Sequence, residues 1–238
     1  MPIPQPTPAE SPDEFVSRCM GDSAMAEYPS DQRLAICHEQ LGPVYELRID
    51  NPDEEGVYIM SLVDSPAIER NFVALSGTKK YELAKIDEER RMIIGPALVP
   101  NKLIVRDDDG KGEYFIWFTE ETVRKAAHGF LKNTNLHRVN IQHEVNVGGV
   151  YTVESWIVED PATDKARSLG FDVPRGTWML AQYVESDAIW EELVKSGVVK
   201  GYSIEGNFVS YMAHNDDITE EELAMAEALL MEELRRVI

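Results

Sequence analysis

The feature that most constrains the fold is a change of residue pattern near Tyr45. Before it, capping signals, among them Ser11 with Glu14, and apolar spacing are typical of two short helices. After it, short apolar runs rich in strand-forming residues recur between turn signals as far as Tyr211. They include predicted strands at 71–75, 81–86 and 201–211. Within 45–211 only two further stretches look helical, one capped by Thr119 and one by Ser186. The pattern predicts an α+β protein built on a barrel or curled sheet with helices around it.

The same change of pattern divides the chain into four parts. They are a proline-rich, disordered lead (1–10), a helical hairpin (11–44), the β-rich domain (45–211) and an acidic C-terminal helix (212–238). Cys19 and Cys37 each fall within a predicted helix of the hairpin. Together with His38 they could supply three ligands of a zinc site, but such a site normally needs four at characteristic spacings. Because a fourth ligand is missing, we expect both cysteines to pack in a helical core.

Charge and hydropathy exclude several classes of function. The formal net charge is −20 at pH 7, and such a surface repels the phosphates of nucleic acids. No apolar run approaches the roughly 18–20 residues that span a bilayer, and the first residues lack the pattern of a signal peptide. We therefore expect a cytosolic chain that binds neither nucleic acid nor membrane. The sequence also lacks a P-loop and a GxGxxG motif, and the acidic turn Asp107–Gly110 lacks the EF-hand pattern, so we expect no cofactor and no metal.

A candidate catalytic imidazole lies in the alternating segment 139–145. His143 shares one face of this predicted strand with valine and isoleucine side chains. If Gly148 and Gly149 form the following hairpin turn, Glu154 lies directly opposite His143. A carboxylate in that position would fix the imidazole tautomer and stabilise the imidazolium. A histidine satisfied within the core is the other interpretation, and His137, which has the same parity, is the reserve candidate.

The candidate nucleophile is Ser203, in the segment Gly201-Tyr-Ser-Ile-Glu-Gly206. A serine between nearby glycines, just after a helix and a turn, can present its hydroxyl beside backbone N–H donors. The spacing is not that of the GxSxG elbow, and the order of His143 before Ser203 disfavours an α/β-hydrolase.

Six segments, in order along the chain, resemble the XkdF-like family of phage serine proteases. They are Tyr58–Ala67, Arg91–Pro100, Phe118–Val123, Asn140–His143, Val153–Val158 and Gly201–Gly206. The resemblance implies a closed, mainly antiparallel β-barrel of the prohead-protease and assemblin type. It also implies a His–Ser pair on neighbouring strands, which His143 and Ser203 match. The activity it implies is cleavage of scaffold or capsid precursors inside a prohead, often with self-cleavage.

The prediction from the sequence is therefore a serine endopeptidase of phage head maturation. Ser203 would be the nucleophile, His143 the base and Glu154 the residue that orients the base. The expected substrates are the phage scaffold and major capsid proteins, in the host cytoplasm inside the assembling prohead, and self-association is left open. The alternative is a non-enzymatic prohead scaffold or interaction protein that retains the protease fold.

Overall fold

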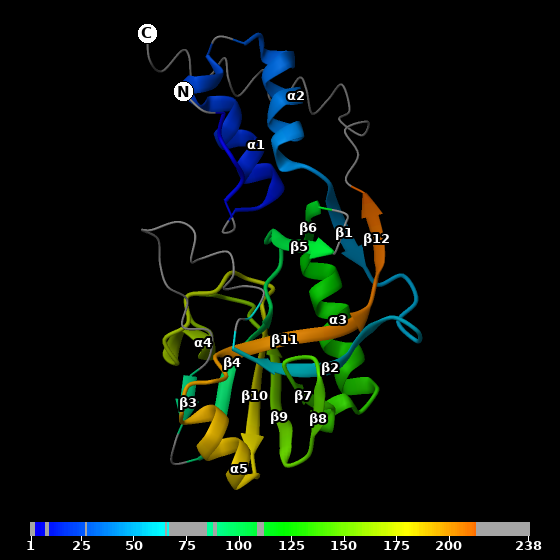
Figure 1. The fold of residues 1–238 in the computed structure, drawn as a ribbon, viewed down its shortest axis with the longest axis vertical. Coiled ribbons are helices and arrows are strands. Elements are labelled where there is room, and N and C mark those ends of the chain that lie inside the picture. Colours follow the sequence, from blue (N-terminus) through cyan, green and yellow to red (C-terminus); the bar gives the residue numbers. More distant parts are fainter. Residues whose placement is uncertain are drawn as a thin grey trace.

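A computed structural model describes residues 3–7, 10–26, 28–64, 66, 85–87, 90–108 and 112–212. Among the described residues, an N-terminal pair of helices lies at one end, and three sheets with further helices follow (Figure 1). The expected C-terminal helix lies outside the described residues, as do the predicted strand at 71–75 and most of the one at 81–86.

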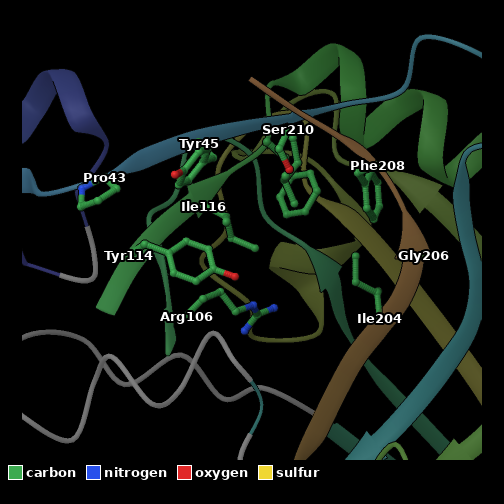
Figure 2. Close-up of a pocket in the computed structure, with 11 residues that line it drawn as sticks. Pro43, Tyr45, Arg106, Tyr114, Ile116, Ile204, Gly206, Phe208 and Ser210 are labelled. Carbon is green, nitrogen blue, oxygen red and sulfur yellow. The ribbon is translucent and has the colours of Figure 1, made fainter. Parts of the chain in front are cut away.

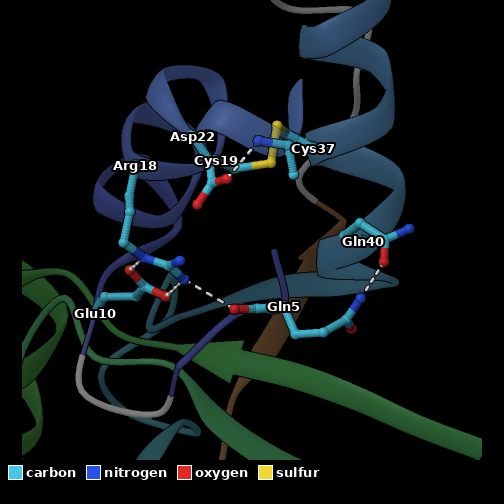
Figure 3. Close-up of a disulfide and its surroundings, with 8 residues drawn as sticks. Gln5, Glu10, Arg18, Cys19, Asp22, Cys37 and Gln40 are labelled. Atoms are coloured by element: carbon cyan, nitrogen blue, oxygen red, sulfur yellow. Dashed lines mark hydrogen bonds and ion pairs between the residues drawn. A yellow bond between two sulfur atoms is a disulfide. The ribbon is translucent and has the colours of Figure 1, made fainter. Parts of the chain in front are cut away.

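The N-terminal hairpin consists of α1 (Pro12–Gly21) and α2 (Ser30–Leu41). The capping box at the start of α1 is present: the Ser11 hydroxyl accepts from Glu14 N–H, and the Glu14 carboxylate accepts from Ser11 N–H. Cys19 and Cys37 are fully buried, as predicted, and they also form a disulfide between the two helices (Figure 3). The hairpin thus has a small core of its own, which packs on the neighbouring β1 and β6.

Three four-stranded sheets carry the rest of the described chain. The β1 sheet has the order β12-β1-β6-β5, formed by Val209–Met212, Val44–Arg48, Gly112–Trp117 and Ile104–Asp108. The β10 sheet has the order β3-β4-β10-β9, formed by Lys85–Asp87, Met92–Leu98, Trp178–Val184 and Val150–Ile157. The β2 sheet has the order β11-β2-β7-β8, formed by Gly201–Asn207, Gly56–Val63, Val139–Ile141 and Val145–Val147.

The α+β class is confirmed, but the closed barrel is not supported. Within the ranges described, the strands form three separate sheets, each with two edge strands. Most pairs are antiparallel, while β1–β6 and β2–β7 are parallel. The chain leaves one sheet and enters the next where the sequence predicted one continuous strand, 201–211. A β-bulge between Glu205 and Gly206 bends it, so that β11 ends in the β2 sheet and β12 joins the β1 sheet.

The main core lies where the β2 sheet, the β10 sheet and α3 (Glu120–Lys132) meet. Thr119 caps α3 as predicted, its hydroxyl accepting from Thr122 N–H. Phe130 of α3 packs edge-on against Trp178 of β10, with ring centroids 5.4 Å apart. The Tyr202 hydroxyl donates to the Ile93 carbonyl at 2.8 Å and ties the β2 sheet to the β10 sheet. These contacts bury one face of the β2 sheet in the core, and polar residues occupy its other face.

The remaining helices in the described ranges are short. They are η1 (Ser23–Met25), η2 (Asn135–His137), α4 (Lys165–Ser168) and α5 (Asp187–Ile189), which continues into a π-helical turn over Trp190–Val194. The predicted cap at Ser186 is present, because its hydroxyl accepts from Ile189 N–H.

Candidate active site

Four polar residues form a row across one face of the β2 sheet. Ser203 of β11 lies opposite Ser61 of β2, Ser61 is paired with Asn140 of β7, and Asn140 with Asn146 of β8. Paired residues share a face, whereas Tyr202, next to Ser203, points the other way into the core. Ser61 and Asn140 are buried, Ser203 is partly exposed and Asn146 is exposed. The row therefore runs from one edge of the sheet to the other, with its centre shielded from solvent.

His143 lies in the tight turn between β7 and β8, beside this row. The Glu144 N–H donates to the Ile141 carbonyl at 3.0 Å, and the central residues Gln142 and His143 have φ angles of 54° and 60°. Non-glycine residues rarely adopt such angles, and the ones that do are concentrated at functional sites. The sequence had placed His143 inside a strand, on an apolar face. That was wrong, because the side chain is at a turn and 41% exposed.

The His143 imidazole folds back over the sheet and meets Glu205 of β11. Nδ1 of His143 lies 3.0 Å from Oε1 of Glu205 and 2.9 Å from Oγ of Ser61. The amide Nδ2 of Asn140 donates to the same Glu205 oxygen at 2.5 Å, and the Ser61 hydroxyl donates to it at 3.4 Å. Three donors from three different segments thus converge on one carboxylate oxygen.

This convergence keeps Glu205 ionised. Burial, the largest single effect, raises the pKa of the Glu205 carboxyl, but the hydrogen bonds from Asn140, His143 and Ser61 together outweigh it and lower the pKa. An ionised carboxylate can only accept, so the nitrogen of His143 that faces it carries the proton. In the neutral ring Nε2 is then the basic nitrogen, which is the tautomer that a general base needs.

Ser203 lies next to this cluster without being bonded to it. It shares the face of Glu205, two residues along the same strand, and lies opposite Ser61. Cβ atoms of directly opposed residues are roughly 4.5–5.5 Å apart, so Ser203 is an immediate neighbour of Ser61, whose Oγ contacts the imidazole. Within the described residues no hydrogen bond joins Ser203 Oγ to His143. Catalytic hydrogen bonds in ligand-free enzymes are often long and tighten only with substrate.

The predicted pairing of His143 with Glu154 is wrong. Glu154 lies opposite Ala181 of β10, in a different sheet, and its carboxylate forms an ion pair with Lys165 at the surface. The error came from Gly148-Gly149, which do not close a hairpin: β8 before them pairs with β7, whereas β9 after them pairs with β10. The glycines mark the point where the chain changes sheets.

The reserve imidazole, His137, is also elsewhere. It belongs to η2 and packs against Tyr151, with ring centroids 5.4 Å apart. Of the histidines considered for the site, it is therefore His143 that the structure brings to the serine-bearing face.

A cavity of about 540 Å³ lies on the other side of β11 (Figure 2). Ile204, which alternates with Ser203 and Glu205, contributes to its wall, so the cavity is not part of the polar face. Two edge-on aromatic pairs border it, Tyr45 with Tyr114 and Phe118 with Phe208. The whole lining comprises Pro43, Tyr45, Leu47, Arg106, Tyr114, Ile116, Phe118, Ile204, Gly206, Phe208 and Ser210.

Neither a metal cluster nor a membrane span is found in the part of the chain that the structure describes. There, no group of three or more His, Cys, Asp or Glu side chains is placed to hold a metal ion. None of the helices in those ranges is long and apolar enough to cross a membrane.

A carboxylate on Nδ1 of an imidazole, with strand serines beside the ring, is the set of groups used by serine hydrolases. Comparison with known proteins finds a family that is named for the same class. A profile of the family described as "Putative phage serine protease XkdF" matches residues 80–212, more than half of the chain. The chain belongs to this family, and the resemblance predicted from the sequence is confirmed. The matched range contains His143, Ser203 and Glu205 but not Ser61.

Two curated proteins of Bacillus subtilis (strain 168) are similar to the chain. The uncharacterized protein YqbD is 27% identical over 169 residues, which cover 68% of this chain and 48% of YqbD. The phage-like element PBSX protein XkdF is 28% identical over 169 residues, covering 70% of this chain and 54% of that protein. The chain thus spans about half the length of these relatives. No solved structure gave a significant match.

Proposed function

We propose that the chain is a serine endopeptidase in which Ser203 is the nucleophile, His143 the base and Glu205 the residue that orients the base. The observation that carries this is the 3.0 Å contact between Nδ1 of His143 and Oε1 of Glu205. It supports the Nδ1–H tautomer, which leaves Nε2 to accept a proton from a hydroxyl. Ser61 meets the protonated nitrogen, so the imidazole cannot activate it, and this argument favours Ser203.

The proposed reaction has two halves. In the first, Ser203 Oγ attacks the scissile carbonyl carbon while Nε2 of His143 takes the hydroxyl proton. The imidazolium then gives that proton to the leaving amine, and an acyl-enzyme remains on Ser203. In the second half, water attacks the acyl group, Nε2 takes a proton from the water, and Ser203 is released protonated. Glu205 stabilises the imidazolium formed in each half.

In the phage, we propose that this activity cleaves scaffold and major capsid precursors during head maturation, inside the prohead in the host cytoplasm. Membership of a phage protease family supports that setting, as does the name of the PBSX relative. The biological test is co-expression with the neighbouring scaffold and capsid genes, with cleavage read by intact mass. Wild-type protein should shorten a partner, and Ser203→Ala should leave it intact.

The nucleophile can be tested without a known substrate by using a fluorophosphonate probe. The activated serine Oγ bonds to phosphorus and fluoride leaves, adding a fixed mass that can be mapped by peptide sequencing. Wild-type and Ser61→Ala proteins should be labelled at Ser203, and Ser203→Ala should not react. Labelling at Ser61 would overturn the assignment.

The competing proposal is a non-enzymatic head component that retains the protease fold. The observation in its favour is the missing hydrogen bond between Ser203 and His143 within the described residues. A wild-type protein that neither reacts with the probe nor cleaves its head partners would support this second proposal and reject the first.

A further inference from the structure

We propose that Asn140 is a positioning residue, whose buried amide holds the Glu205 carboxylate ionised and aimed at His143. This inference rests on the proposed function, because it assigns a role within the same site. Asn140 would touch neither the substrate nor the nucleophile. It would act through Glu205, and Ser61 would support it from the neighbouring strand.

The first argument is geometric. The side chain of Asn140 is buried, with only 4% of the residue exposed, and its Nδ2 lies 2.5 Å from Oε1 of Glu205. Its backbone belongs to β7, an inner strand held by β2 on one side and β8 on the other. The backbone of Asn140 is therefore fixed on both sides. The Glu205 carboxylate keeps this hydrogen bond only while it stays in one position, so the amide holds it there.

The second argument concerns the orientation of the amide. If the amide were flipped, its Oδ1 would face the Glu205 carboxylate, and two acceptors would be in contact without a proton between them. Nδ2 therefore faces Glu205. The consequence is that Oδ1 is buried with no hydrogen-bond partner in the described part of the chain. Buried acceptors are nearly always paired, so this amide is kept at a cost to stability that an apolar side chain would avoid.

The third argument concerns the choice of an amide. A lysine or arginine in this place would form an ion pair with Glu205 and compete with the imidazolium for its charge. An amide donates a hydrogen bond and stays neutral, so the full negative charge remains for His143. Ser61 has the same property: its hydroxyl is fully buried and donates to the same oxygen. The carboxylate thus has neutral donors inside the sheet and faces the His143 imidazole at the surface.

The test compares Asn140→Asp with Asn140→Leu, and uses Asn146→Asp as a matched control. Asp has nearly the shape of Asn but puts a second carboxylate beside Glu205, and two adjacent carboxylates share one proton more readily as the pH falls. Asn146 lies opposite Asn140 on the same face, is exposed, and has no hydrogen bond to Glu205 in the described structure. The readout is the rate of fluorophosphonate labelling at Ser203 between pH 5 and 8, divided at each pH by the wild-type rate.

The expected results separate a positioning role from a structural one. At pH 8 the labelling rate of Asn140→Asp should be about 10- to 100-fold below the wild-type rate, because the variant loses a hydrogen bond to a charged group. It should recover as the pH falls, because the shared proton restores a donor to Glu205. The Asn140→Leu ratio should be low throughout and should not recover as the pH falls, because leucine cannot share a proton with Glu205. Asn146→Asp should stay within about twofold of wild type, as expected of a surface change.

A second measurement does not depend on labelling. The side-chain carboxyl of Glu205 can be titrated by carbon NMR in the wild type and in Asn140→Leu, and removing the donor should raise the pKa of that carboxyl. An unchanged Glu205 titration, together with an Asn140→Asp ratio that does not vary with pH, would overturn the proposal. A wild type that is never labelled, with the titration still shifted, would instead reject the proposed function and leave the Asn140–Glu205 contact as a purely structural one.

Discussion

Oε1 of Glu205 lies 3.0 Å from Nδ1 of His143, although 62 residues separate them in the sequence. The contact joins an edge strand of the β2 sheet to the turn at its other side. Between them lie β2 and β7, whose buried Ser61 and Asn140 donate to the same carboxylate oxygen. Residues of three neighbouring strands thus fix one imidazole, and none of them is near Glu154, which lies in the β10 sheet.

Glu205→Gln and Glu154→Gln form a matched pair that tests which carboxylate serves His143. Each change replaces a carboxylate with a neutral amide of the same shape. We expect Glu205→Gln to slow labelling of Ser203 by about 100- to 10,000-fold, because the amide cannot stabilise the imidazolium and permits the wrong tautomer. Glu154→Gln should stay within about twofold, because it loses only a surface ion pair with Lys165. If Glu154→Gln slowed labelling much more than Glu205→Gln did, Glu154 would be the carboxylate that serves His143.

The turn at His143 provides a test of stability as well as of activity. His143→Gly and His143→Ala both remove the imidazole, and both should abolish labelling at Ser203. They should differ in stability, because the residue has a φ of 60° and alanine resists that angle whereas glycine does not. In urea denaturation we expect the glycine variant to have a free energy of unfolding about 1 kcal/mol above that of the alanine variant. Equal stabilities would mean that the positive φ is not kept in solution.

That same turn explains why the site was only partly predictable from the sequence. Hairpin turns with positive φ favour Asn and Gly, and Gln142-His143 carries no such signal, whereas Gly148-Gly149 a few residues later does. The stronger local signal gave the wrong turn. It therefore gave the wrong register, and with it Glu154 instead of Glu205. Local turn chemistry was overruled by pairing with β2, which no local pattern encodes.

Other parts of the fold followed from local rules. The capping residues Ser11, Thr119 and Ser186 begin helices where expected, since a cap depends only on the next few residues. Strand parity puts Ser203 on the face opposite the core, because the neighbouring Tyr202 is buried. The same parity puts Glu205 on that face, so the sequence did hold a signal for it: a glutamate two residues from the candidate nucleophile. The assignment of strands to three sheets rests on long-range pairing and was beyond these rules.

Lys102 should make the stability of the protein depend on pH. It is only 7% exposed and lines a cavity where Ser11 and Glu14 of the hairpin meet the β-rich part. Burial lowers the pKa of its amine from 10.5 to about 8. Between those two values the unfolded chain binds more protons than the folded one, so the free energy of unfolding should rise with pH from about 8 to 10.5. The full effect is on the order of 3 kcal/mol.

The measurement for Lys102 is urea denaturation at a series of pH values from 7 to 11. The rise should be present in the wild type and absent in Lys102→Met, which keeps a long side chain without the amine. Lys132→Met is the control, since that lysine is at the surface and pairs with Asp53. A rise that persists in Lys102→Met would assign the effect to another group.

The disulfide of the N-terminal hairpin should stabilise the protein without affecting the candidate site. Cys19 and Cys37 are 18 residues apart, and closing a loop of that length stabilises a folded chain by about 3 kcal/mol. The core around them does not include Ser203, His143 or Glu205. Adding reductant to the purified protein should therefore lower its melting temperature. The rate of labelling at Ser203, measured well below that temperature, should not change.

The control is the Cys19→Ala/Cys37→Ala variant, which should melt like the reduced wild type and be insensitive to reductant. If reduction slowed labelling in the wild type but not in this variant, the hairpin would have to be coupled to the polar face of the β2 sheet.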